Sequence, residues 1–192
     1  MKHLHRILGL GVFVALTIGM SSCFVLSDIS NSLKEIEEVM DGKVFQIPTA
    51  TLAYSDGTTF SFSEYGKKQR VAKNSEVYIF ADSVYYQLDT QSKTGYKYTY
   101  SGEYAYNTTY CFLEATWKLA NYDETVKKST ETIAGKRCTV YTDTDDDDKV
   151  GGWKRIVFLD GDVRAISFTT DVAENAFTVP ADYQITDSTN AY

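Results

Sequence analysis

The pattern of apolar and polar positions divides the chain into a helical stretch, a long series of strands and a helical interruption. Apolar side chains recur at helical spacing over residues 30–40 and again over residues 108–121, which predicts two amphipathic helices. Elsewhere after residue 43, short alternating runs are separated by Gly, Asn and Asp, which favour turns. Their spacing of about 8–12 residues is typical of an antiparallel sheet or barrel.

Turn-forming residues mark the bounds of the predicted strands. Asp160-Gly161 is a strong signal for a two-residue hairpin turn, and Ala134-Gly135 is predicted as another turn. The strands are predicted at residues 49–54, 58–64, 69–73, 76–80, 84–89, 96–100, 130–133, 136–142, 153–159, 163–170 and 177–180.

Several of these strands carry apolar residues on both faces. Tyr85 and Tyr86 are neighbours in one strand, so their side chains point to opposite faces. A sheet with one wet face would not show this pattern, so we expect a second layer, supplied by the two helices. The predicted fold class is α+β: a strongly curved antiparallel half-barrel of about 9–11 strands with two helices covering the concave face.

The N-terminus has the features of a secretion signal. Lys2 and Arg6 precede an uncharged apolar run over residues 7–20, which is too short to span a bilayer. The segment 20–23, Met-Ser-Ser-Cys, resembles the lipobox of bacterial lipoproteins. That resemblance implies that residues 1–22 are removed, that Cys23 carries a diacylglycerol, and that residues 23–29 tether a single domain of residues 30–192. The alternative is an ordinary secretion signal with an incidental cysteine.

Charge and localisation follow from this assignment. Without residues 1–22, the chain has 17 basic and 26 acidic residues, a net charge of −9. Such a domain should be repelled by nucleic acid and by anionic lipid, so its membrane attachment has to come from the lipid anchor. We expect a cell-envelope protein of the bacterial outer membrane, because Phe24 rather than Asp follows the lipidated cysteine.

The composition argues against most catalytic chemistry. The only histidines, His3 and His5, lie in the signal, which excludes catalytic triads and His-ligated zinc from the mature chain. No spacing of carboxylates selects an acid–base pair, so we expect no enzyme activity, metal or cofactor. The acidic run 143–148 lacks the loop glycine and final glutamate of an EF-hand. We therefore interpret it as a solvated hairpin tip rather than a calcium site.

Two cysteines remain after lipidation. Cys111 and Cys138 would close a loop of roughly 26 residues if they paired, worth about 3–4 kcal/mol. An envelope compartment permits the disulfide, which is the preferred interpretation, and the alternative is two buried free thiols.

Four short motifs resemble the outer-membrane lipoprotein carrier (LolA/LolB-like) superfamily: Arg70 before a strand, residues 80–89, residues 107–113 and the closing segment 177–183. The resemblance implies a half-barrel whose concave face holds acyl chains beneath helices, with Arg70 nearest to the arginine that locks the lid. The chain departs from the family in two ways. The soluble carrier has no lipid anchor, and the exposed apolar loop of the anchored receptor is not recognisable here.

The candidate ligand site is aromatic. In a lidded half-barrel, Tyr78, Tyr85, Tyr86, Tyr96, Tyr98 and Trp117 would line a cavity, and tyrosine offers apolar area with a polar tip. The alternative is ordinary cross-strand packing. We expect a non-catalytic, lipid-anchored protein that binds a lipid or acyl chain. A module with a filled core that holds an envelope protein partner is the alternative, and a carboxylate-based hydrolase is a third hypothesis.

Overall fold

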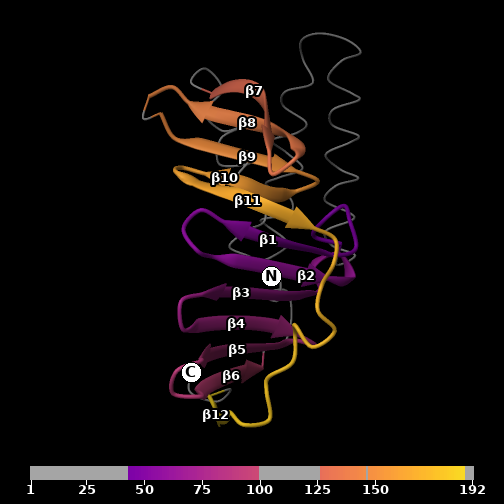
Figure 1. The fold of residues 1–192 in the computed structure, drawn as a ribbon, viewed down its shortest axis with the longest axis vertical. Coiled ribbons are helices and arrows are strands. Elements are labelled where there is room, and N and C mark those ends of the chain that lie inside the picture. The colour runs from indigo at the N-terminus through magenta and orange to yellow at the C-terminus, as the bar shows by residue number, and fades with distance from the viewer. Residues whose placement is uncertain (1–42, 100–125, 146, 189–192) are drawn as a thin grey trace, which may run out of the picture. The chain divides into compact units, whose positions relative to one another are not determined.

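The alternating sequence pattern produces one open sheet of twelve strands in the computed structural model, which describes residues 43–99, 126–145 and 147–188 (Figure 1). All described residues belong to one compact unit, Gly42–Tyr192. The strands are β1 (Ala50–Tyr54), β2 (Thr59–Ser63), β3 (Lys68–Lys73), β4 (Glu76–Ala81), β5 (Val84–Asp89), β6 (Thr94–Thr99), β7 (Val126–Ile133), β8 (Lys136–Asp143), β9 (Lys149–Trp153), β10 (Ile156–Asp160), β11 (Val163–Thr169) and β12 (Gln184–Asp187).

The strand order in the sheet is β12-β6-β5-β4-β3-β2-β1-β11-β10-β9-β8-β7. Two meanders, β1–β6 and β7–β11, therefore meet at the antiparallel pair of β1 and β11, which joins Leu52 to Phe168. The exception to antiparallel pairing is β12, which lies parallel to β6. Hairpins explain the meanders, because antiparallel strands need only tight turns between them.

Two-residue turns with positive φ at both positions connect several of these strands, as the right-handed twist of a hairpin favours. They are Asp82-Ser83, Ala134-Gly135 and Lys154-Arg155. The predicted turn at Ala134-Gly135 is confirmed. The hairpin turn predicted at Asp160-Gly161 lies one position later, at Gly161-Asp162, with Gly161 at a φ of 55°. The turn at Lys154-Arg155 was not predicted, because neither residue type favours positive φ.

The α+β prediction, with two helices covering a half-barrel of 9–11 strands, is wrong. The described residues form a nearly all-β structure, an open twelve-stranded sheet whose one helical element is the three-residue 3₁₀ turn η1 (Glu64–Gly66). The predicted helices, residues 30–40 and 108–121, lie outside the described residues. No helix in the part of the chain that the structure describes is long and apolar enough to cross a membrane.

Two strand predictions are also wrong. The predicted strand 153–159 crosses the Lys154-Arg155 turn, so its two halves belong to β9 and β10. The predicted strand 177–180 is irregular chain, and pairing resumes only in β12. In the first case a continuous apolar run hid the turn. In the second, apolar side chains pack against the sheet without joining its hydrogen-bond ladder.

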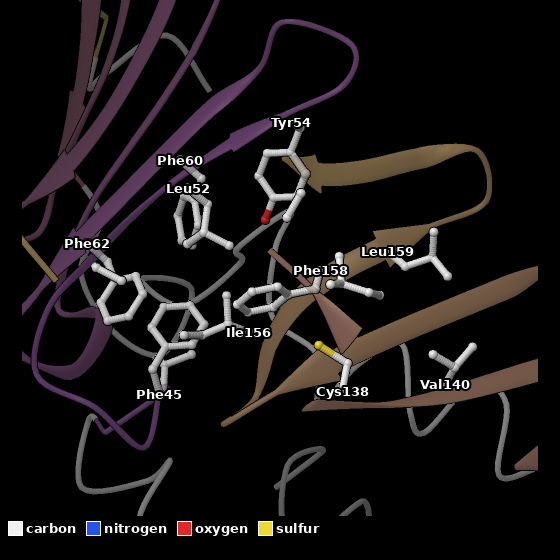
Figure 2. Close-up of a cluster of buried hydrophobic side chains, with 14 residues drawn as sticks. Phe45, Leu52, Tyr54, Phe60, Phe62, Cys138, Val140, Ile156, Phe158 and Leu159 are labelled. Carbon is white, nitrogen blue, oxygen red and sulfur yellow. The ribbon is translucent and has the colours of Figure 1, made fainter. Parts of the chain in front are cut away.

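The main core lies between β1–β2 and β8–β11 (Figure 2). Phe45, Phe60 and Phe62 are fully buried, and the ring centroids of Phe45 and Phe62 are 4.2 Å apart. Ile156 and Phe158 close the cluster from β10. Buried side chains of both meanders thus contact one another in one cluster.

One buried hydrogen bond ties the meanders together across this core. The Tyr54 hydroxyl of β1 donates to the Val157 carbonyl of β10 at 2.7 Å. The two residues are 103 positions apart in sequence. Tyr54 also lies beside Ala165 at the β-bulge of β1 and β11. The accepting carbonyl lies next to the register shift between Val157 and Leu159 in the β10–β9 pair.

Removing this hydroxyl should destabilise the fold without changing its shape. Tyr54→Phe leaves the buried Val157 carbonyl without this donor, so we expect the free energy of unfolding to fall by about 1–2 kcal/mol. Urea denaturation followed by tyrosine fluorescence measures it. An unchanged midpoint would show that the bond contributes nothing to the junction.

The second layer over β3–β6 is the segment 171–183 between β11 and β12, which we call the strap. Figure 1 shows it leaving β11 and running past the other meander to β12. Its side chains Phe177, Val179 and Tyr183 pack against the buried cluster Val77, Ile79, Ala81 and Leu88. A covered second face was thus correctly expected from the sequence, but the strap supplies the cover seen here.

Polar contacts hold both ends of the strap. At its start, the Thr51 hydroxyl donates to the Asp171 carbonyl at 3.0 Å. At its end, Lys93 pairs with Asp182 at 2.6 Å. The Gln184 amide then donates to the Lys93 carbonyl, which begins the parallel pairing of β12. The ion pair is exposed, so the apolar contacts of the strap contribute most of its stability.

The β1–β2 hairpin depends on Asp56, which was part of a predicted turn. Its carboxylate accepts hydrogen bonds from the Thr58 amide, the Thr58 hydroxyl and Lys73 Nζ, at 2.7–3.0 Å. The Lys73 ammonium is the largest cause that lowers the pKa of Asp56, to about 2. The carboxylate stabilises the fold above its unfolded pKa, and this contribution is lost as pH falls towards 2.

Asp56→Asn should therefore destabilise the protein in a pH-dependent way. At pH 7 we expect a loss of about 1 kcal/mol or less, because the pair with Lys73 is partly exposed and screened. The difference between variant and wild type should shrink between pH 4 and pH 2. Thermal denaturation across that range checks it, and a constant difference would contradict the assigned role of the charge.

Candidate functional site

The candidate site is the face of β4–β6 opposite the strap. Strand alternation places Tyr78 and Phe80 of β4, Tyr85 of β5, and Tyr96 and Tyr98 of β6 on this face, which we call the aromatic face. The register sets Phe80 opposite Tyr85, and Tyr85 opposite Tyr98. Three neighbouring strands therefore contribute one continuous row of rings.

The rings of this row contact one another. The centroids of Tyr78 and Tyr85 are 6.2 Å apart, with the rings stacked at 24°. Those of Tyr85 and Tyr98 are 6.3 Å apart at 43°. These side chains are half-buried, and Tyr96 is 50% exposed. Such rings combine apolar surface with hydroxyl tips, which suits a partly apolar ligand.

The hydroxyl of Tyr78 donates to Glu76 Oε2 at 2.9 Å. This hydrogen bond is the main cause that raises the pKa of Tyr78, and partial burial adds to it. The phenol is therefore neutral at physiological pH and cannot act as a base or nucleophile. The contact fixes the ring orientation at the edge of the row.

The structure separates Tyr86 from the other candidate tyrosines. Tyr86 lies on the strap face, where it packs against the cluster of Ile79 and Leu88. Arg70, the candidate lid-locking residue, also lies on the strap face, because its partner in the register is Ile79. Four of the tyrosines therefore share one face, and Tyr86 and Arg70 share the other.

Three of the predicted site residues lie outside the described residues: the lipidation candidate Cys23, the cavity candidate Trp117 and the disulfide candidate Cys111. Sequence reasoning missed Phe80, although it stands two positions after Tyr78 in a strand and must share its face. It also missed the strap, because irregular chain carries no periodic pattern.

The described residues of the acidic run 143–148 include the end of β8 and part of its connection to β9, where we predicted a hairpin tip. Here the Asp145 amide donates to Asp143 Oδ1, and the Asp143 amide donates to the Asp148 carbonyl. Among the described residues, no group of three or more Asp, Glu, Cys or His side chains is arranged to hold a metal ion.

Cys138 is a fully buried cysteine of the main core. Its Sγ donates to the Lys136 carbonyl at 3.5 Å. Burial raises the pKa of the Cys138 thiol to about 11. The disulfide to Cys111 stays a prediction, because that residue lies outside the described part of the chain.

No protein-family model matches this chain, and no curated protein matches it significantly in sequence. The resemblance to the lipoprotein-carrier superfamily therefore stays a prediction from short motifs.

Alkylation should distinguish a thiol from a disulfide at Cys138. With a pKa near 11, about one thiol in a thousand is ionised at pH 8, and only the thiolate reacts. If Cys138 is a free thiol, its peptide should be labelled by iodoacetamide in urea without reductant and at least about 100-fold more slowly in the native protein, as measured by mass spectrometry. Rapid native labelling would contradict the burial, and labelling in urea only after reduction would establish a disulfide.

Proposed function

We propose that this protein is a non-catalytic, lipid-anchored protein of the bacterial outer membrane that binds an acyl chain of an apolar or amphipathic ligand on its aromatic face. The observation that supports this most directly is the row of contacting, half-buried rings formed by Tyr78, Tyr85 and Tyr98. The lipobox-like segment ending at Cys23 supports the anchor.

Because the main core is filled, we do not place the proposed site in an internal half-barrel cavity. Phe60, Phe62 and Phe158 are fully buried against other protein side chains, so the region between the two meanders leaves no room there for a ligand. The strap covers the opposite face of β4–β6. The aromatic face is an apolar surface of the described sheet whose tyrosines are half-buried or exposed.

The expected affinity follows from the apolar area covered. A methylene fully removed from water contributes about 0.8 kcal/mol, and a chain lying on an open face has roughly half of that area covered. About fourteen methylenes then contribute roughly 5–6 kcal/mol, which corresponds to a Kd of about 0.1 mM. This weak binding suits a ligand that is already concentrated at a membrane surface.

The filled core also favours a second candidate function, an interaction module. Aromatic residues such as the exposed Tyr96 are enriched at the centres of protein interfaces. In that case a protein partner would cover the aromatic face, and no acyl chain would bind.

A fluorescent fatty acid tests the proposal. The unlipidated mature chain should bind it with saturation near 0.1 mM, and the double variant Tyr85→Ser/Tyr98→Ser should bind about tenfold more weakly, because two rings are lost.

The matched control is Tyr141→Ser, which removes a half-buried tyrosine from β8 in the other meander and should leave binding unchanged. Equal loss in control and double variant would point to general destabilisation, which contradicts a site on the aromatic face. Absence of saturable binding by wild type would favour the interaction module.

A further inference from the structure

The antiparallel topology gathers the connections between strands at two opposite ends of the sheet (Figure 1). One end, on the right in Figure 1, holds the segment 43–49 that leads into β1 and the turns β2–β3, β4–β5, β7–β8 and β9–β10. The other end holds the turns β1–β2, β3–β4, β5–β6, β8–β9 and β10–β11. The charged side chains of these connections therefore form two separate surfaces.

The two ends carry opposite charge. Counted over the described connections and the strand residue on either side of each, the first end has six basic and two acidic side chains, a net charge of +4. We call it the basic end. By the same count the other end has three basic and nine acidic side chains, a net charge of −6, and we call it the acidic end. The six basic residues are Lys43, Lys67, Lys68, Lys136, Lys154 and Arg155.

Ion pairs take up most of the acidic side chains at the basic end. The Lys68 ammonium is 2.8 Å from Glu64 and 4.0 Å from Asp82, the two acids of the count. Asp187, the last residue of β12, also lies at this end and is paired with Lys97 at 2.9 Å. The start of the strap adds one further aspartate. One lysine thus faces both acids of the count, and the other basic side chains keep their charge uncompensated by them.

Three lysines of the basic end, Lys43, Lys67 and Lys154, are exposed and have no ion pair among the described residues. Hydrogen bonds hold two of their segments together. The Arg155 guanidinium donates to the Lys43 carbonyl at 3.1 Å, and the Gln46 amide donates to the Lys154 carbonyl at 3.3 Å. The lysines therefore belong to one fixed surface rather than to separate loops.

An exposed aromatic side chain lies on the same surface. Tyr65 is 39% exposed, and Lys43 Nζ is 5.9 Å from its ring centroid. Two backbone hydrogen bonds fix the left-handed conformation of Tyr65: its amide donates to the Pro48 carbonyl at 3.0 Å, and the Phe45 amide donates to the Tyr65 carbonyl at 2.9 Å. An aromatic ring with a polar tip beside lysines suits the headgroup region of a membrane, where both parts of the side chain are accommodated.

We propose that the basic end faces the membrane and contacts the phosphates of anionic phospholipids, which orients the anchored domain. The inference rests on the lipid anchor of the proposed function, because a mature chain with a net charge of −9 would not stay on an anionic surface by itself. Residues 23–42 join the described domain at Lys43, so the chain from the proposed anchor enters at the basic end. An anionic surface attracts this end and repels the acidic end, and each lysine near the surface favours this orientation by about fivefold.

A tethered form of the mature chain allows this orientation to be measured whether or not cells lipidate the protein. The thiol of Cys23 is coupled to a maleimide-headed phospholipid in vesicles of phosphatidylcholine, made with or without phosphatidylglycerol. Cys111→Ser in the coupled chain and the full burial of Cys138 direct the coupling to Cys23.

Acetylation of lysines by N-hydroxysuccinimide acetate, quantified by mass spectrometry, then reports which end faces the vesicle. Lys67 and Lys154 should react at least about threefold more slowly on vesicles with phosphatidylglycerol than on vesicles without it. Lys127 and Lys149, exposed lysines near the acidic end, should react equally on both. Salt at about 1 M should remove the protection, because it shortens the Debye length to about 3 Å.

Matched double variants test whether the lysines of the basic end cause the orientation. Lys67→Gln/Lys154→Gln should abolish the protection of Lys43 on vesicles with phosphatidylglycerol. Lys127→Gln/Lys149→Gln removes the same charge near the other end and should keep that protection.

Three results would overturn the proposal: equal acetylation of Lys67 and Lys154 on both kinds of vesicle, protection of Lys127 and Lys149 instead, or equal loss in both double variants. Protection that appears without vesicles as the protein concentration rises would assign the basic end to the acidic end of a second copy, which also contradicts the proposal. The fatty-acid titration uses the unanchored chain without vesicles, so either experiment can fail while the other succeeds.

Discussion

Apolar side chains on both faces of β4–β6 impose the constraint on which this structure depends. Alternation directs Val77, Ile79 and Leu88 to one face and the tyrosine row to the other, so each face needs its own protection from water. The strap protects the first face with Phe177, Val179 and Tyr183. The half-buried tyrosines of the second face tolerate partial exposure, because a tyrosine ring that packs against its neighbours carries a polar hydroxyl at its tip.

Between the two meanders, apolar side chains are protected from water in a different way. Between β1–β2 and β8–β11, aromatic and aliphatic side chains meet in a dry core, and the Tyr54 hydroxyl satisfies a carbonyl that lies inside it. This core fixes β1 and β11, and the strap leaves directly from the end of β11. The position of the strap, and with it the contact of Tyr183 with the apolar cluster of β4 and β5, therefore follows from the packing of the main core.

Local chemistry explains how far the sequence predicts the fold. Period-two runs bounded by Asp, Asn and Gly identify β1–β6, β8 and β11 to within a few residues, because hairpins are local. The Lys154-Arg155 turn escaped prediction because its residues have no turn preference, and its strain is tolerated by the packing around Arg155, which is 5% exposed. The strap and the parallel β12 depend on contacts about 90 residues apart, such as that of Lys93 with Asp182, which no local pattern contains. The second layer was therefore assigned to helices, which led to the wrong fold class.

The candidate site, like the fold, is predicted only in part by local sequence patterns. Period two alone separates Tyr85 from Tyr86, and it would also have placed Phe80 with Tyr78. The alternation does not show which face of the sheet is covered by other parts of the chain. That cover decides whether a tyrosine side chain packs in the interior or lies at the surface. Arg70 was singled out through a family resemblance, and the register of β3 with β4 places it on the strap face.

A spin-labelled fatty acid measured by NMR tests the central claim, that the aromatic face accepts an acyl chain, most directly. The account predicts paramagnetic broadening of the ring signals of Tyr78, Tyr85 and Tyr98, with the signals of Tyr86 and Tyr141 retained. Broadening centred on Tyr86, or no selective broadening at saturating probe, would contradict it.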